Sequence, residues 1–99
     1  MSSSMPLYKT AIVPASAAAQ VGSTGVRRLM GVVLFGGSAN SQVEFKNAAT
    51  DTGTVLLGVN ALIGTTNFVD LSEFGGILFD TAIYCKPAGA GAIAYVWYD

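Results

Sequence analysis

Turn-forming residues divide this sequence into short segments, and their spacing limits what the chain can fold into. Glycine, which adopts the tight-turn conformations that other residues avoid, occurs 12 times in 99 residues. The segments between the turns have the length of β-strands and contain many β-branched and aromatic residues, which favour strands. The clearest turn signals lie at residues 36–38, 47–53, 64–66, 75–76 and 87–91.

Two segments show side-chain patterns that are typical of strands. Residues 42–46 place Val43 and Phe45 on one face and polar side chains on the other, which predicts a strand with one face on a core and one in water. Residues 92–98 are apolar or aromatic on both faces, which predicts a central strand or one covered by a neighbour. The two faces of that strand carry Ile93, Tyr95 and Trp97, and Ala92, Ala94, Val96 and Tyr98.

The pattern as a whole predicts an all-β protein with a single antiparallel β-sandwich, jelly-roll-like and built from about eight short strands. A short helical turn is an alternative at residues 14–20, where Ser16 is a possible cap for an Ala-rich turn. We expect the sandwich domain to span residues 7–99, after an amino-terminal arm of residues 1–6. The expected strands lie near residues 7–14, 17–23, 27–36, 41–47, 53–60, 65–71, 76–86 and 91–98.

Charge is the scarcest property of the chain. Charged residues make up 11% of the sequence and there is no histidine, whereas a soluble domain normally carries about 25% charged residues. A surface so poor in charge predicts association with other protein, and we expect a homo-oligomer, with a trimer as the simplest guess. The net charge of −1 provides no basic excess for phosphate backbones, so nucleic acid is not an expected partner. The adjacent pair Arg27 and Arg28 fits solvent-exposed or rim positions, the alternative being contact with a phosphate or a partner carboxylate.

Neither a membrane span nor a leader peptide is expected. The longest apolar run, residues 29–35, is far shorter than the roughly 18 residues that a transmembrane helix needs. Residues 9–19 have the charge and the small residues of a signal peptide, but Pro14 interrupts an apolar region that is already too short.

The arm of residues 1–6 has a serine-rich composition that normally frays unless it is held by other structure. We expect the arm to pack on another subunit, with Met1 and Met5 in apolar recesses and Pro6 fixing the direction in which the chain leaves. Docking on its own subunit is the alternative.

The residues that carry most enzyme chemistry are missing or scattered. Nucleophilic catalysis usually needs a base beside the nucleophile, most often histidine, and the chain has none. Asp70 and Glu73 fit a polar loop better than an acid–base pair. Asp51, Asp70 and Asp80 lie in or near loops and have the chemistry to ligate a hard cation such as calcium, but they are scattered singly in the sequence and do not indicate a metal site. The single Cys85 lies in an apolar run and fits a core position. We therefore expect no enzymatic activity, no cofactor and no metal.

Four aromatic residues near the carboxyl end are the main candidates for contact with a partner: Tyr84, Tyr95, Trp97 and Tyr98. As core or subunit-interface residues they would contribute strand packing, with Trp97 as the principal anchor. The alternative is a stacking platform for sugars, because aromatic faces pack well against a pyranose ring.

Three motifs in order carry a family resemblance: Gly-Val-Val-Leu-Phe-Gly-Gly-Ser at 31–38, Asn-Ala-Ala-Thr-Asp-Thr-Gly-Thr-Val-Leu at 47–56 and Ala-Ile-Ala-Tyr-Val-Trp-Tyr-Asp at 92–99. In this order they resemble small tailed-bacteriophage virion proteins of β-sandwich type, over roughly residues 21–98. The resemblance implies that Gly-Gly-Ser is a hairpin turn and that the Asn-Ala motif is a loop. Lys46 departs from the acidic or polar turn residue expected before that loop, which argues against cation binding there.

The resemblance implies a structural role and transfers no functional residues. It leads us to expect a capsid decoration or cement protein, located in the virion and assembled in the host cytoplasm. Its expected partners are further copies of itself and the major capsid protein or another virion protein. The alternative is a glycan-binding or host-adsorption module on a tail or fibre.

Overall fold

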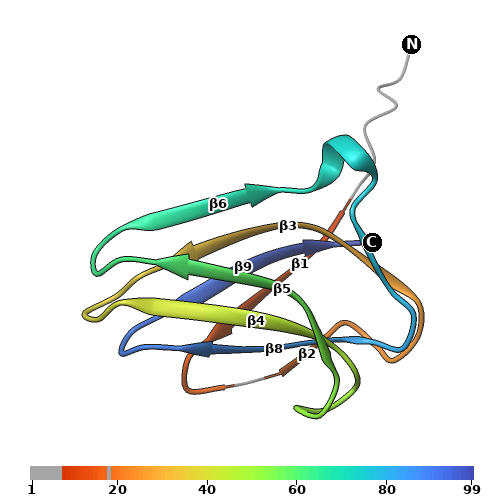
Figure 1. The fold of residues 1–99 in the computed structure, drawn as a ribbon, viewed down its shortest axis with the longest axis horizontal. Helices are drawn as coiled ribbons and strands as arrows, with labels where there is room; N and C mark the ends of the chain where they lie inside the picture. Colours follow the sequence, from red (N-terminus) through yellow and green to blue (C-terminus); the bar gives the residue numbers. More distant parts are fainter. Residues whose placement is uncertain (1–7, 18) are drawn as a thin grey trace.

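The computed structural model describes residues 8–17 and 19–99, which fold into two antiparallel sheets packed face to face (Figure 1). This confirms the predicted all-β sandwich. The predicted arm with Met1, Met5 and Pro6 lies outside the described residues. The elements are β1 (Lys9–Pro14), β2 (Ala19–Val21), β3 (Arg27–Phe35), β4 (Ser41–Asn47), β5 (Thr54–Ala61), β6 (Thr66–Asp70), the 3-10 helix η1 (Ser72–Phe74), β7 (Ile77–Phe79), β8 (Ile83–Ala88) and β9 (Ile93–Tyr98).

The order of the strands is that of a jelly roll. Sheet A has the order β1-β9-β3-β6, with β7 also paired to β3, and sheet B has the order β2-β8-β4-β5. The chain can be drawn as one long hairpin in which β1 pairs with β9, β2 with β8, β3 with β6 and β4 with β5. Successive pairs of this hairpin fall alternately in sheet A and sheet B, which is the jelly-roll arrangement and confirms that prediction.

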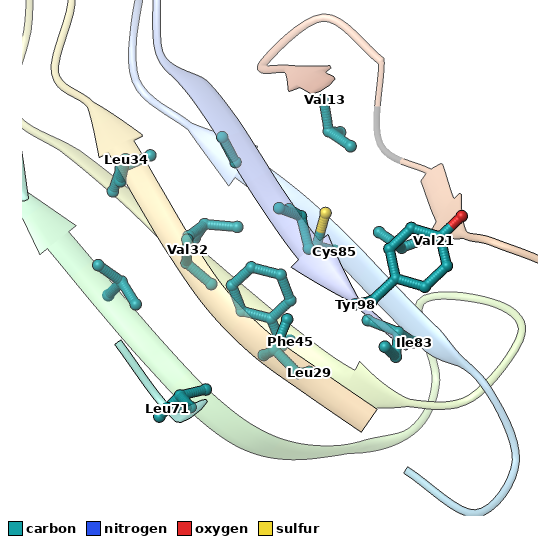
Figure 2. Packing of buried hydrophobic residues seen from close by; sticks show 14 of the residues in the cluster. Val13, Val21, Leu29, Val32, Leu34, Phe45, Leu71, Ile83, Cys85 and Tyr98 are labelled. Atoms are coloured by element: carbon teal, nitrogen blue, oxygen red, sulfur yellow. The ribbon is translucent and has the colours of Figure 1, made fainter. Parts of the chain in front are cut away.

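The core lies between the inward faces of the two sheets. Figure 2 shows side chains from both sheets meeting there, among them Val32 from β3, Phe45 from β4 and Ile83 from β8. All three are fully buried. On β4, Gln42 and Glu44 alternate with the buried Val43 and Phe45 and are exposed, which confirms the predicted alternation along that strand.

Strand β9 is central, as the sequence predicts, because it lies between β1 and β3 in sheet A. Ala94, Val96 and Tyr98 are buried in the core. Successive side chains of a strand point to opposite faces, so Tyr95 and Trp97 stand on the outer face of sheet A.

One predicted strand is wrong: residues 76–86 form two strands that belong to different sheets, β7 in sheet A and β8 in sheet B. The chain crosses over at Asp80 and Thr81, and Asn47 at the end of β4 holds this crossover. Its Nδ2 donates to Asp80 Oδ1 at 2.7 Å, and its Oδ1 accepts the Thr81 N–H at 2.9 Å. The Gly25 N–H donates to the Thr81 carbonyl at 2.7 Å. These contacts come from distant segments, so no local pattern marks the break.

Two smaller expectations are also corrected. The helical turn considered at residues 14–20 is a tight turn after β1, in which the Ala17 N–H donates to the Pro14 carbonyl at 3.0 Å. The Gly-Gly-Ser segment is no hairpin turn, because it joins β3 in sheet A to β4 in sheet B. Glycine is required there, since a Cβ on Gly37 would lie 2.6 Å from the carbonyl carbon of Gly91.

Candidate interaction face

The outer face of sheet B is polar. Gln42 and Glu44 on β4 and Lys86 on β8 are exposed there. Asp51, from the loop between β4 and β5, lies over this face with its carboxylate 2.5 Å from Lys46 Nζ and 3.4 Å from Lys86 Nζ. Hydrogen bonding by Lys46 is the main cause that lowers the pKa of Asp51 below its usual value. Ionised side chains of this kind favour contact with water.

The outer face of sheet A is apolar. The strand register sets Ile12, Tyr95, Val33 and Phe68 side by side in one row across β1, β9, β3 and β6. Ile12 is 67% exposed, Phe68 61% and Tyr95 38%. A neighbouring row carries Ile93 and Phe35, between Pro14 and Thr66. We call the set Ile12, Val33, Phe35, Phe68, Ile93, Tyr95 and Trp97 the apolar face.

A pocket of about 190 Å³ opens at one end of the apolar face. It lies over Gly31, whose register partners are Trp97 on one side and Asp70 on the other. The rings of Phe68 and Trp97 stand near Gly31 with their centroids 6.3 Å apart and their planes at 70°. The residues that line the pocket are Tyr8, Met30, Gly31, Phe68, Asp70, Ser72 and Trp97.

Asp70 brings a negative charge to the rim of this pocket. Its Oδ1 accepts hydrogen bonds from the Ser72 hydroxyl at 2.6 Å and from the Ser72 N–H at 3.0 Å. These two bonds, the hydroxyl first, lower the pKa of Asp70 below its usual value of 3.8. The carboxylate is therefore ionised at neutral pH.

The four aromatic candidates do not form one platform. Tyr95 and Trp97 stand on the outer face of sheet A, as argued above from β9. Tyr84 is half-buried in β8 of sheet B, where it pairs with Lys46. Tyr98 is buried in the core. The predicted interface roles of these residues stay predictions, but a single sugar platform made of all four is excluded by their positions.

Sequence reasoning missed Ile12, Phe35 and Phe68 as members of the outer face. Each lies on a different strand, and only the register between strands distant in sequence shows that they are neighbours. The local alternation of Asn67, Phe68 and Val69 was the one signal available, and it does not tell which side chain faces outward.

The remaining candidates have structural partners. Cys85 is fully buried, which confirms the predicted core position, and burial raises its pKa to about 12. Arg27 donates to the backbone carbonyl of Ser23 at 3.2 Å and Arg28 to that of Gly75 at 3.4 Å. Within residues 8–17 and 19–99, no three His, Cys, Asp or Glu side chains come together to hold a metal ion.

A larger, open hollow of about 580 Å³ lies beside the ends of β4 and β5, and no ionisable side chain lines it. No helix in the described part of the chain is long and apolar enough to cross a membrane. No protein-family model, curated protein or solved structure matches this chain. The chemistry of the two outer faces is therefore what can guide a functional proposal.

Proposed function

We propose that this protein is a non-enzymatic structural protein that works by adhesion, with its apolar face as the contact surface. The observation that carries the proposal is the difference between the outer faces. Sheet B exposes Glu44 and Lys86 and carries the half-buried Lys46. In the three outward rows of sheet A, the one charged residue is Asp70, at the end of the row that contains Trp97. Large apolar patches on soluble proteins usually mark sites of interaction.

A stable contact through this face requires a broad surface. A standard interface buries about 800 Å² on each partner, which is roughly 15% of the 5427 Å² accessible surface of this structure. The molecule measures 44 × 32 × 19 Å, so a flat sheet face is one of its broadest surfaces. Burial of apolar area stabilises association at roughly 25 cal/mol per Å², before the cost of the lost translational and rotational entropy is subtracted.

We propose further that copies of the chain associate through this face, and that the oligomer decorates a phage capsid by contact with the major capsid protein or another virion protein. The capsid role rests on the sequence resemblance and on the jelly-roll fold, which viral coat proteins share with lectins and cupins. Repeated weak contacts at symmetric sites would add up to firm attachment.

Light scattering after size exclusion tests the association. We expect wild-type protein at micromolar concentration to have a multiple of the 10.2 kDa chain mass, three copies being the prediction from sequence. Tyr95→Glu places a charge in the middle of the apolar face, and we expect it to dissociate the oligomer. The matched control is Gln42→Glu, which adds the same charge to the polar face of sheet B. A monomeric wild type would overturn the proposal.

Attachment is tested separately with phage particles that lack this protein. Wild-type protein and Gln42→Glu should co-sediment with the particles, and Tyr95→Glu should remain in the supernatant. Equal sedimentation of all three would show that the apolar face is not needed for attachment.

Of the four aromatic residues in the glycan-binding alternative, only Tyr95 and Trp97 share a face, because Tyr84 lies in sheet B and Tyr98 in the core. This alternative predicts a saturable change of Trp97 fluorescence with one member of a panel of host polysaccharides. The adhesion proposal predicts no change.

A further inference from the structure

We propose that the pocket over Gly31 is a binding site for a cationic side chain, a lysine or an arginine, presented by a protein partner. That a protein presents this side chain rests on the function proposed above. The affinity of the pocket for a cationic side chain does not depend on that function.

The pocket exists because the middle of its floor has no side chain. Gly31 lies between Trp97 and Asp70 in the register of sheet A. A Cβ added to Gly31 would stand 3.8 Å from Trp97 Cε3 and 3.9 Å from Phe68 Cε1. The two rings therefore flank the bare backbone. The register of β3 against β9 also shifts between Leu29 and Gly31, and Met30 in this irregularity contributes to the lining.

The walls suit a cation because three aromatic residues line them: Tyr8, Phe68 and Trp97. The faces of aromatic rings carry negative potential and attract ammonium and guanidinium groups. Phe68 and Trp97 form an edge-to-face pair with planes at 70°. In such a pair the ring that contributes its edge keeps both of its own faces free for another partner.

The rim adds an unpaired negative charge. Both hydrogen bonds from Ser72 go to Oδ1 of Asp70. In the described part of the chain, no lysine or arginine nitrogen lies within ion-pair distance of Asp70, since both ion pairs found there belong to Asp51. A neutral partner covering the pocket would desolvate this carboxylate without compensation, which is costly.

The size of the pocket fits a single side chain. Its volume of about 190 Å³ is below the roughly 300–1,000 Å³ that sites for drug-sized ligands occupy. A lysine or arginine would lay its apolar stem along Met30 and the rings and bring its charge to Asp70. The surroundings therefore match both halves of such a side chain.

Trp97 is the only tryptophan, so its indole N–H gives one assignable signal in a proton–nitrogen correlation spectrum. We would titrate labelled protein with the N-acetyl methylamides of lysine and arginine, and with that of norleucine as a neutral probe with a similar stem. We expect a saturable shift with at least one cationic probe, with a dissociation constant on the order of millimolar, and little shift with norleucine. The titration is run on wild type and on Tyr95→Asn, which disturbs the apolar face without adding charge.

Three variants test whether the shift comes from the contacts proposed for the pocket. Asp70→Asn should weaken binding of the cationic probe about fivefold, the effect of one exposed charge pair. Gly31→Ala should reduce the shift because its methyl group occupies the floor at ordinary contact distances. Gly58→Ala is the matched control, since Gly58 lies on β5 of the other sheet with nothing within 4 Å of an added Cβ.

The proposal is overturned if a cationic probe shifts the Trp97 signal of neither wild type nor Tyr95→Asn. It is also overturned if the norleucine probe binds as tightly as the cationic probes, or if Asp70→Asn binds the cationic probe as tightly as wild type does. A saturable shift with a pyranose and none with the cationic probes would replace it with a sugar site. Light scattering of the same samples reports on self-association, so failure of the pocket and failure of the adhesive function are distinguished.

Discussion

Gly22 shows at the scale of one residue how the core and a turn constrain each other. Its φ is +74°, in the left-handed region that L side chains rarely adopt. A Cβ at this position would lie 2.7 Å from Cε2 of Tyr98, whose ring is buried. Tyr98 therefore acts in the structure as a core residue that needs a glycine beside it.

We expect Gly22→Ala to lower the free energy of unfolding by about 1–2 kcal/mol, because backbone strain adds to displacement of the Tyr98 ring. Urea denaturation followed by circular dichroism measures the change. Gly58→Ala, which meets no neighbouring atom, should be neutral or slightly stabilising. Equal effects of the two variants would contradict this account of Gly22.

Asn47 stabilises a contact between distant segments, because its side chain joins the end of β4 to the crossover at Asp80 and Thr81. Asn47→Ala removes both hydrogen bonds and leaves the Thr81 N–H to find water. We expect a loss of about 1–2 kcal/mol in the free energy of unfolding. Relative to wild type, the rate of hydrogen exchange should increase more at Thr81 than at Phe45, since the change affects the crossover and not the core. An equal increase at both sites would argue for a global effect only.

At the scale of elements, Asp51 connects the β4–β5 loop to two strands of sheet B through Lys46 and Lys86. Its pKa is lowered from 3.8, first by the hydrogen bond from Lys46. A carboxylate with a lowered folded-state pKa contributes stability above its unfolded value, and this stability is lost as pH falls through the folded value. The pKa of Lys46 is raised from 10.5, mainly by the same bond, so the contribution of Lys46 is lost at high pH.

The stability difference between wild type and Asp51→Asn should therefore be constant near neutral pH and shrink as pH falls below 3.8. It should also shrink at high salt, because Asp51 and Lys86 are exposed and Lys46 is only half-buried. Denaturation midpoints at pH 7, 4, 3 and 2 measure the trend. A difference that persists at the lowest pH would show that the ion pair is not its source.

The elements themselves are largely visible in the sequence. Periodicity and glycine punctuation locate seven of the nine strands to within a few residues, and the division of the β9 side chains into two faces follows from alternation alone. The split of residues 76–86 does not, because it depends on Asn47, 33 residues before Asp80 in the chain. The apolar face was found only in part for the same reason: Ile12 and Phe68 become neighbours through pairing with β9 and β3.

At the scale of the whole molecule, two aromatic residues separate folding from association. Phe45 is fully buried in the core. Trp97 stands half-buried on the outer face, where the other sheet does not cover it. Truncation of a buried large side chain costs about 3–5 kcal/mol, and a half-buried one costs less.

We therefore expect Phe45→Ala to lower the melting temperature strongly at every protein concentration. Trp97→Ala should lower it less, and mainly by removing the dependence on protein concentration that an oligomer shows. Scanning calorimetry over a hundredfold range of concentration distinguishes the two effects. A Trp97→Ala protein as unstable as Phe45→Ala would mean that the tryptophan serves the fold and not association.

The position of β9 has a consequence for biosynthesis. Lys9 pairs with Tyr98, and β9 also lies next to β3. Until residues 93–98 have left the ribosome, β1 therefore has no partner strand and β3 is paired only with β6 and β7. Contacts so distant in sequence slow folding and leave apolar strands uncovered in the meantime. The nascent chain thus carries an incomplete sheet A until residues 93–98 emerge, and we expect chaperones to matter to it most in that interval.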